Sequence, residues 1–198
     1  MGRFPGQVVA ATRNPGKLQE ILAICADWPV TWLTFEQIPW PEVDESGTAY
    51  LDNALLKARA VAEATGHAAL ADDSGLEVDA LGGAPGPRSA RYAGADATDQ
   101  DNLRALLRAV AGVPRAGRTA RYRAVALIAW PDGRHLSAEG DCEGLLRTRP
   151  SGSEGFGYDP IFEPMGWDRT MAELEPDEKN RISHRGRALR ALREILAG

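Results

Sequence analysis

The sequence predicts an α/β fold built on a mixed sheet. Short apolar runs alternate with segments of helical periodicity along most of the 198 residues, as they do in proteins whose helices pack against a sheet. Near the middle of the chain, Pro131-Asp132-Gly133 is a strong turn sequence between two strand-like segments and indicates a hairpin. Strand–helix alternation combined with a hairpin favours a sheet that contains both parallel and antiparallel pairs.

The first third of the chain is predicted to hold two strands and two helices. Residues 8–11 are a compact apolar run and predict a buried first strand, and apolar side chains then recur at helical spacing over residues 18–25. Residues 30–35 predict a second strand. The next helix ends near Thr65, and Lys57 lies at the flank of its apolar stripe, where a lysine is usually a solvated surface charge. The apolar positions of this helix are Leu51, Ala54, Leu55, Ala58, Val61 and Ala62.

A pair of adjacent acids follows. An apolar run at residues 68–71 leads into Asp72 and Asp73, a Ser-Gly turn comes next, and apolar and acidic residues then alternate over residues 76–80 as in another strand. Carboxylates at a strand tip suit metal binding or proton abstraction, because they are hard oxygen ligands and can act as bases. Neighbours in an extended backbone point to opposite faces, so we expect the two acids to divide the work. The same residues also suit a solvated turn without function.

The second half of the chain continues the alternation of helices and strands. Gly and Pro are dense at residues 82–87, and Thr98 is placed to cap a helix. The predicted elements after that cap are a strand at residues 119–130, its hairpin partner at 134–138, another strand at 142–148, short helical pieces at 170–175 and 178–182, and a C-terminal helix from about residue 184.

Composition predicts a single domain over residues 1–198, located in the cytoplasm. Apolar residues make up 43% of the chain, which is enough for a substantial core. The formal net charge of −5 argues against general nucleic-acid binding, although it allows a local basic pocket for one phosphorylated small molecule. Two cysteines are too few for a disulfide framework, and no apolar run approaches the roughly 20 residues of a membrane span. These features argue against nucleic acid and a membrane as partners and leave room for a small-molecule partner.

The loop between the first strand and the first helix is a candidate anion site. It reads Thr12-Arg13-Asn14-Pro15-Gly16-Lys17. Backbone N–H groups and the helix dipole face such a loop, and Lys17 adds a formal positive charge. It is not a Walker A loop, because Leu18 stands where Ser or Thr must follow the lysine and Ala11 replaces the first glycine. A capped helix with a solvated lysine explains the same residues without function.

Two segments near the C-terminus carry further aromatic and cationic groups. Glycines on both sides of Phe156 leave its ring little backbone cover, as in a stacking platform, although a Gly-rich turn with Phe156 and Tyr158 in the core is equally consistent with the pattern. Residues 183–187 concentrate cationic donors at the start of the last helix. That placement opposes the helix dipole and indicates an anionic or carbonyl ligand.

Six blocks of the sequence, taken together, identify a family resemblance. They are Thr12-x-Asn14-x-x-Lys17, Asn53-Ala54-x-x-Lys57-Ala58, Ala71-Asp72-Asp73-Ser74-Gly75-Leu76, the Gly-Gly-Ala-Pro-Gly run with Ser89-Ala90-Arg91-Tyr92, Gly155-Phe-Gly-Tyr-Asp-Pro-Ile-Phe162, and Ser183-His184-Arg185-Gly186. In this order they resemble the signature of the inosine triphosphate pyrophosphatase family (HAM1-like, dITP/XTP pyrophosphatases). The resemblance covers essentially the whole chain.

The resemblance implies a Mg²⁺-dependent hydrolase of non-canonical purine nucleoside triphosphates. Such an enzyme cuts ITP, dITP and XTP to the monophosphate and pyrophosphate and so cleanses the nucleotide pool. The family also implies a homodimer, each subunit having two lobes around a long mixed sheet with flanking helices and an active site in the cleft between the lobes.

The resemblance also implies roles for individual residues. Asp73 matches the general base and a metal-associated carboxylate, and Glu45 matches the second acid near magnesium, with Asp44 as the alternative. The other residues are matched to the substrate. Those that hold the triphosphate are Thr12, Arg13, Asn14, Pro15, Gly16, Lys17 and Lys57, Asp72 supports the site of Asp73, and Ser74 contacts the substrate. The loop that stacks on the purine is Gly155, Phe156, Gly157, Tyr158 and Asp159, and the residues around the purine and its 6-keto oxygen are Lys179, His184 and Arg185.

The sequence departs from the family pattern at two of these blocks. Arg13 stands where a small residue is common, which can alter phosphate contacts, and Asp52 replaces the usual Glu before Asn53-Ala54. Two alternatives stay open: a Maf-like pyrophosphatase of canonical or modified pyrimidine nucleotides, and a non-catalytic module that binds nucleotides or nucleic acid.

Overall fold

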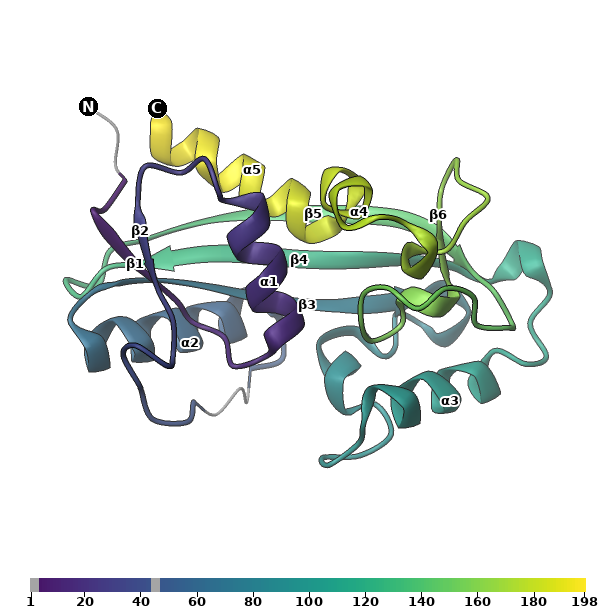
Figure 1. Cartoon of the computed structure of the whole chain (residues 1–198). Helices are drawn as coiled ribbons and strands as arrows, with labels where there is room; N and C mark the ends of the chain where they lie inside the picture. Colours follow the sequence, from purple (N-terminus) through teal and green to yellow (C-terminus); the bar gives the residue numbers. More distant parts are fainter. Residues whose placement is uncertain (1–3, 44–46) are drawn as a thin grey trace. The chain divides into compact units, whose positions relative to one another are not determined.

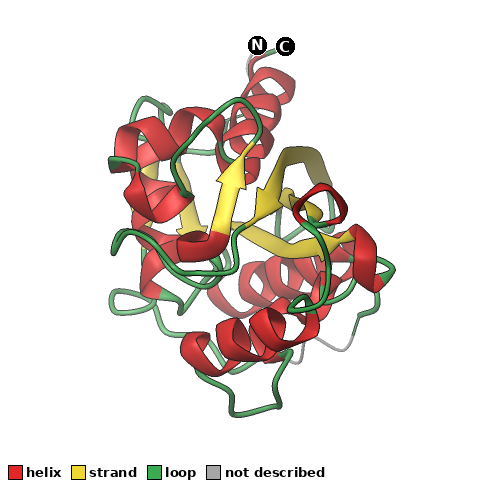
Figure 2. Ribbon diagram, turned by 90° about the vertical axis from the view of Figure 1, so that its right-hand side faces the viewer, coloured by secondary structure: helices red, strands yellow, loops and turns green. Residues whose placement is uncertain are grey.

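A computed structural model describes residues 4–43 and 47–198. Its helices and strands are drawn in Figure 1 and, turned by 90°, in Figure 2. The α-helices within the described ranges are α1 (Pro15–Ile24), α2 (Tyr50–Thr65), α3 (Asp99–Ala109), α4 (Pro176–Ile182) and α5 (His184–Ala197). Each corresponds to a helical segment expected from the sequence. None of the helices in these ranges is long and apolar enough to cross a membrane.

Six strands of the described residues form one mixed sheet in the order β2-β1-β3-β4-β5-β6. Their bounds are β1 (Gln7–Ala10), β2 (Thr31–Leu33), β3 (Ala68–Val78), β4 (Thr119–Ala129), β5 (His135–Leu146) and β6 (Phe162–Pro164). β1 pairs in parallel with β2 and β3, whereas β5 pairs antiparallel with β6. The predicted α/β fold with a mixed sheet is confirmed.

The predicted mid-chain hairpin joins β4 to β5. Trp130 N donates to Arg134 O beside the turn, and Leu146 N donates to Arg118 O at the far ends of the two strands. From one bond to the other, residue numbers fall from 130 to 118 on the β4 side and rise from 134 to 146 on the β5 side, as an antiparallel pair requires. The turn at Pro131-Asp132-Gly133 is therefore confirmed.

By its internal contacts the chain divides into two compact units. The first comprises residues 1–73, 124–140 and 185–198, and the second comprises residues 74–123 and 141–184. The single domain predicted over the whole chain, and the two lobes and cleft that the resemblance implies, stay predictions.

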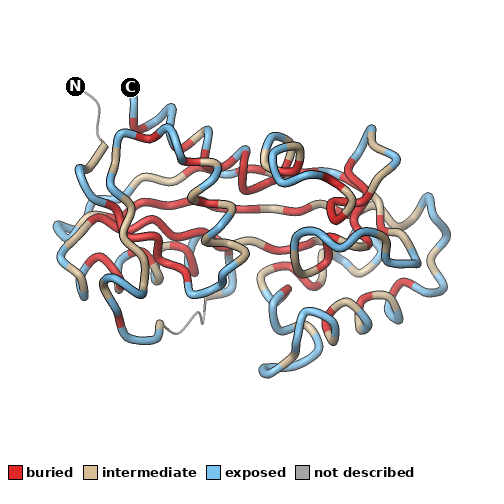
Figure 3. Tube along the Cα trace, in the orientation of Figure 1, coloured by how far each residue is buried: buried red, intermediate tan, exposed pale blue. Residues whose placement is uncertain are grey.

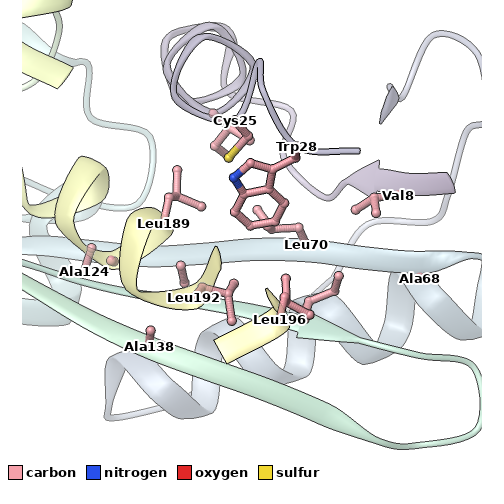
Figure 4. Close-up of a cluster of buried hydrophobic side chains, with 14 residues drawn as sticks. Val8, Cys25, Trp28, Ala68, Leu70, Ala124, Ala138, Leu189, Leu192 and Leu196 are labelled. Atoms are coloured by element: carbon pink, nitrogen blue, oxygen red, sulfur yellow. The ribbon is translucent and has the colours of Figure 1, made fainter. Parts of the chain in front are cut away.

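In the first unit the sheet is buried on both faces, because neighbouring strand residues point opposite ways. Val8 and Leu70 pack in one apolar cluster with α1 and α5, and Val9 and Ala71 pack in another with α2. Figure 1 shows α1 and α5 on one side of these strands and α2 on the other. Figure 4 shows the first cluster, to which Trp28 also contributes. Even-numbered positions in this part of β3 thus face α1 and α5, and odd-numbered positions face α2.

The second unit has its own apolar core. It joins side chains of β3, β4 and β5 with α3 and the segment around β6; the buried members are Leu76, Val78, Leu106, Val110, Ala120, Tyr122, Cys142, Leu146, Tyr158, Ile161, Phe162, Met171 and Leu174. Thr98 caps α3 as predicted, since its side chain accepts from Asp101 N while the Asp101 carboxylate accepts from Thr98 N. This reciprocal capping box fixes where α3 begins.

The turn predicted at Ser74-Gly75 is wrong, because β3 runs without a break from Ala68 to Val78 and is buried along most of its length (Figure 3). A Cβ on Gly75 would lie 2.2 Å from Gly86 O and 2.7 Å from Ser89 Oγ. Glycine is needed here for close approach of another backbone segment. Asp72 and Asp73 consequently lie inside a strand rather than at its tip.

The two separate strands predicted at residues 134–138 and 142–148 are also wrong, because they are one strand, β5. Alternate residues are buried from Ala138 through Gly140 to Leu146, so Gly140 continues the strand period. The short strand β6 was not expected from the sequence at all. It pairs with β5 at Gly144, where a Cβ would meet Glu163 O at 2.4 Å.

Candidate active site

Asp72 and Asp73 are both buried, with 1% and 5% of their surface exposed. Their contacts follow the alternation of β3. Asp72 lies against charged groups of α1 and α5, whereas the carboxylate of Asp73 accepts a hydrogen bond from Asn53 Nδ2 of α2 at 3.0 Å. The two acids therefore occupy opposite faces of the strand, as expected, and have different electrostatic surroundings.

The carboxylate of Asp72 is the centre of an ion network. Its Oδ2 accepts from Arg185 Nε at 3.0 Å and Nη2 at 2.8 Å and lies 3.4 Å from Lys17 Nζ. Arg185 Nη1 also donates to Glu20 Oε2 at 2.5 Å. Burial alone would raise the pKa of Asp72, but Arg185, Lys17 and Lys57 together hold it well below its usual range. Asp72 is thus a fixed anion that organises the cations around it.

Arg185 was expected beside the 6-keto oxygen of a purine, and the structure gives its guanidinium other partners. Arg185 is 1% exposed, and three of its nitrogen atoms donate to Asp72 and Glu20 inside the first unit. Burial would lower its pKa, but the two carboxylates raise it above the ordinary arginine value. A contact of Arg185 with a base stays a prediction, whereas its part in holding Asp72 is a feature of the structure.

Lys17 and Lys57 converge on one backbone oxygen. Lys57 Nζ lies 3.3 Å and Lys17 Nζ 3.5 Å from the carbonyl oxygen of Asp72. Burial is the main cause that lowers the pKa of Lys17, with Lys57 and Arg185 adding to it, while Asp72 opposes the shift. Lys57 is half-buried rather than a solvated surface charge. Two ammonium groups directed to one point favour binding of a multiply charged anion.

The loop before α1 is held by its own polar side chains. Asn14 caps the helix by accepting from Lys17 N at 3.0 Å, and Thr12 Oγ1 accepts from Asn14 N at 3.2 Å. Arg13 Nη2 donates to Trp40 O at 2.6 Å, and its guanidinium lies 4.3 Å from the centre of the Phe35 ring. The helix is therefore capped, as the interpretation without function expected. Lys17, however, lies against Asp72 and is not the solvated lysine of that interpretation.

Asp159 anchors the glycine-rich loop in the second unit. Its Oδ2 accepts from Lys179 Nζ at 2.5 Å and from Phe156 N at 2.9 Å, and its Oδ1 accepts from Tyr122 Oη at 3.2 Å. Asp159 and Lys179 are 3% and 5% exposed, so this ion pair is buried. Lys179 Nζ also lies 5.0 Å from the centre of the Phe156 ring. The arrangement holds Phe156, which is half-buried, in a defined position.

The aromatic residues of this loop are used differently. Tyr158 is 4% exposed and donates to Ser89 O at 2.8 Å, and burial raises the pKa of its hydroxyl. Tyr158 is thus a core aromatic, in line with the alternative interpretation. The ring of His184 stacks on Tyr122, with centroids 4.5 Å apart and planes 8° from parallel. Tyr122 was not among the predicted site residues, because nothing in the sequence around it distinguishes it from any other aromatic residue of a buried strand.

The remaining predicted residues are placed as follows. Ser74 is half-buried in β3, and Gly157 N donates to Asp99 Oδ2 at 2.9 Å. Glu45 and its alternative Asp44 lie outside the described residues. Within residues 4–43 and 47–198, no group of three or more His, Cys, Asp or Glu side chains gathers in a way that could hold a metal ion.

Gly155 offers a test of how rigid the loop is. Its φ is +74°, and a Cβ there would lie 2.2 Å from Asp159 Oδ2 and 2.9 Å from Lys179 Nζ. Replacing Gly155 with Ala is expected to cost more than the about 1–2 kcal/mol of a left-handed alanine, because the buried pair must also move. Gly157→Ala is the matched control, since Gly157 has φ +62° and nothing within 4 Å of its Cβ position. The measurement is the free energy of unfolding from urea denaturation. If the two variants lose the same amount, the Asp159–Lys179 pair can move at little cost.

The chain resembles known proteins along almost its whole length. The family model described as the Ham1 family matches residues 8–195. A dITP/XTP pyrophosphatase of Streptomyces coelicolor is 50% identical over an alignment of 197 positions that covers 96% of this chain and 98% of the relative. A protein of the same name from Desulforamulus reducens is 48% identical over 191 residues, covering 96% of this chain and 95% of the relative. The solved structure of a HAM1 protein from Coxiella burnetii superposes with a TM-score of 0.86 at 40% identity, covering 96% of this chain and 98% of that one.

Proposed function

The chain belongs to the Ham1 family, and on that premise we propose that it hydrolyses ITP, dITP and XTP to the monophosphate and pyrophosphate. The observation that carries the proposal is the convergence of Lys17 and Lys57 on the carbonyl oxygen of Asp72, one residue before the buried carboxylate of Asp73. The two lysines that would bind a polyphosphate thus contact the residue of β3 directly before the candidate general base, Asp73. The relatives compared above do not support the Maf-like alternative. We place the enzyme in the cytoplasm, as a homodimer.

In the proposed reaction, Asp73 orients a water molecule and accepts its proton. The water oxygen bonds to the α-phosphorus, the bond from that phosphorus to the α–β bridging oxygen breaks, and pyrophosphate leaves with the electron pair of that bond. Lys17 and Lys57 hold the triphosphate and offset its charge, which lowers the barrier to attack by an oxygen nucleophile. No covalent bond to the enzyme is needed.

Magnesium fits the donor set around Asp73. Mg²⁺ is commonly held by one or two carboxylates together with substrate phosphates, so a cluster of three protein ligands is not required. Asp73 supplies a hard oxygen donor on β3, and Glu45 is our second candidate ligand. When bound, the ion would neutralise phosphate charge and stabilise the leaving pyrophosphate.

We assign recognition of the purine to the second unit. The ring of Phe156 would stack on the base, and the buried Asp159–Lys179 pair holds the loop that presents it. Stacking does not distinguish one base from another, because every base has a π face. Selectivity therefore needs polar groups at the base edge, for which His184 and Lys179 are our candidates.

A panel of nucleoside triphosphates with Mg²⁺ tests the function. We expect pyrophosphate from ITP, dITP and XTP and little from ATP or GTP, with no orthophosphate as the first product. Preferred turnover of dTTP or UTP would instead indicate the pyrimidine-directed class. Binding of ITP without any release of pyrophosphate would indicate a non-catalytic nucleotide-binding module.

The lysine pair gives a quantitative prediction. Lys17→Ala and Lys57→Ala are each expected to raise the KM for ITP about 10- to 100-fold, the loss of one charge-assisted hydrogen bond. Inosine, which has no phosphate, should bind the variants as it binds the wild type. Arg59→Ala is the control, because Arg59 is an exposed cation of the same helix α2. If ITP and inosine lose affinity equally, these lysines act by holding the fold.

A further inference from the structure

We infer that Asn53 is a positioning residue that sets the orientation of the Asp73 carboxylate, an inference that rests on the function proposed above. Asn53 lies in the first turn of α2 and is 1% exposed. Its Nδ2 donates to Asp73 Oδ2 at 3.0 Å. Asn53 belongs to the Asn53-Ala54-x-x-Lys57-Ala58 block of the sequence, in which only the lysine has so far been given a role.

The neighbours of Asn53 show which end of its amide faces Asp73 and which end faces Gly47. An ionised carboxylate accepts hydrogen bonds and donates none, so the nitrogen end of the amide must face Asp73. The oxygen end faces Gly47, where a Cβ would lie 2.5 Å from Asn53 Oδ1. The amide therefore lies with its oxygen toward Gly47 and its nitrogen bonded to the carboxylate of Asp73.

An apolar side chain could fill the same buried space at this position. Asn53 is 1% exposed, and burial of an amide costs free energy unless the amide is hydrogen-bonded. The hydrogen bond to Asp73 is the interaction that an apolar residue could not supply.

One hydrogen bond to a carboxylate has a definite geometric effect. The terminal torsion of an aspartate side chain is broad, so the plane of the carboxylate is not fixed by its rotamer. The hydrogen bond from Asn53 to Oδ2 restrains rotation of that plane and with it the direction of the other oxygen. One turn along the same face of α2, Lys57 reaches the carbonyl oxygen of Asp72. Helix α2 thus holds both the main chain and the side chain of the Asp72–Asp73 pair.

The test is steady-state hydrolysis of ITP by Asn53→Leu and Asn53→Asp. Leucine removes the donor at similar volume, and aspartate keeps the shape while replacing the donor with an acceptor. We expect kcat to fall about 10- to 100-fold in each, as is usual when a group that orients a functional side chain is lost. The KM for ITP should stay within about threefold, because Lys17 and Lys57 are untouched.

Asn102→Leu is the matched control. Asn102 is a buried asparagine of the second unit, 2% exposed, whose amide donates to Ala90 O and accepts from Ala93 N. The Asn102→Leu substitution should lower the melting temperature and leave the kcat of the folded protein within about twofold of wild type. A kcat within twofold of wild type in either Asn53 variant, with or without a lower melting temperature, would overturn the inference. Wild-type protein that releases no pyrophosphate from ITP would overturn the proposed function, and this inference with it.

Discussion

Replacing Asp73 with Asn is expected to lower the turnover of ITP by at least about 100- to 10,000-fold, the contribution of a general base. The substitution is nearly isosteric but removes the negative charge and most of the basicity. The fold should survive, because an amide oxygen at this position can still accept from Asn53 Nδ2, which lies 3.0 Å from Asp73 Oδ2. Loss of a ligand to Mg²⁺ would add to the effect.

The measurement is pyrophosphate release from ITP under saturating Mg²⁺, together with thermal denaturation of the same samples. Asp96→Asn makes the same chemical change at an exposed aspartate of the second unit and should keep activity within about twofold. An Asp73→Asn enzyme that turns over ITP within a few-fold of wild type would remove Asp73 from the mechanism.

The sequence predicted the elements whose signals are local. The apolar period of α2 and the cap at Thr98 depend on residues within a few positions of one another, and both are present in the structure. The hairpin turn at residues 131–133 was predicted for the same reason, since Pro, Asp and Gly set the backbone there directly.

The wrong predictions arose where distant packing overrides a local preference. Ser74-Gly75 is a favourable turn sequence, yet Gly75 stays in β3 because Gly86 and Ser89 approach it closely. No pattern within residues 68–80 carries that information, because the contacting residues lie beyond Gly82. The break predicted between strands at 134–138 and 142–148 is also absent, since alternate residues stay buried from Ala138 to Leu146.

The candidate site shows the same limit. Motifs identified Asp72, Lys57 and Arg185 as important, but the sequence did not show that Arg185 pairs with Asp72, 113 positions away, or with Glu20, 165 positions away. Tyr122 was missed because its role depends on stacking with His184. Residue types can thus be read from a motif, whereas their pairing is a property of the tertiary structure.

The second large effect is expected at Arg185. Arg185→Ala should lower the free energy of unfolding by about 3–5 kcal/mol, because it leaves two carboxylates without the cation between them. One of these, on Asp72, has no exposed surface, and the other, on Glu20, is 11% exposed. A protein of this size should then melt roughly 6–20 °C lower. If Arg185 served mainly to bind the base, the variant would instead keep its stability and change only its ratio of ITP to ATP turnover.

Two further variants separate a buried ion network from a general loss of charge. Arg193→Ala removes an arginine of the same helix α5 whose ion pair with Asp27 is exposed. This substitution should lower the free energy of unfolding by at most about 1 kcal/mol. Combining Arg185→Met with Asp72→Asn removes cation and anion together. The double variant should therefore lose less free energy of unfolding than the two single variants lose in sum. Strict additivity, or an Arg185→Ala protein as stable as Arg193→Ala, would show that the Arg185–Asp72 contact contributes little, and selectivity for the 6-keto group would become the leading role of Arg185.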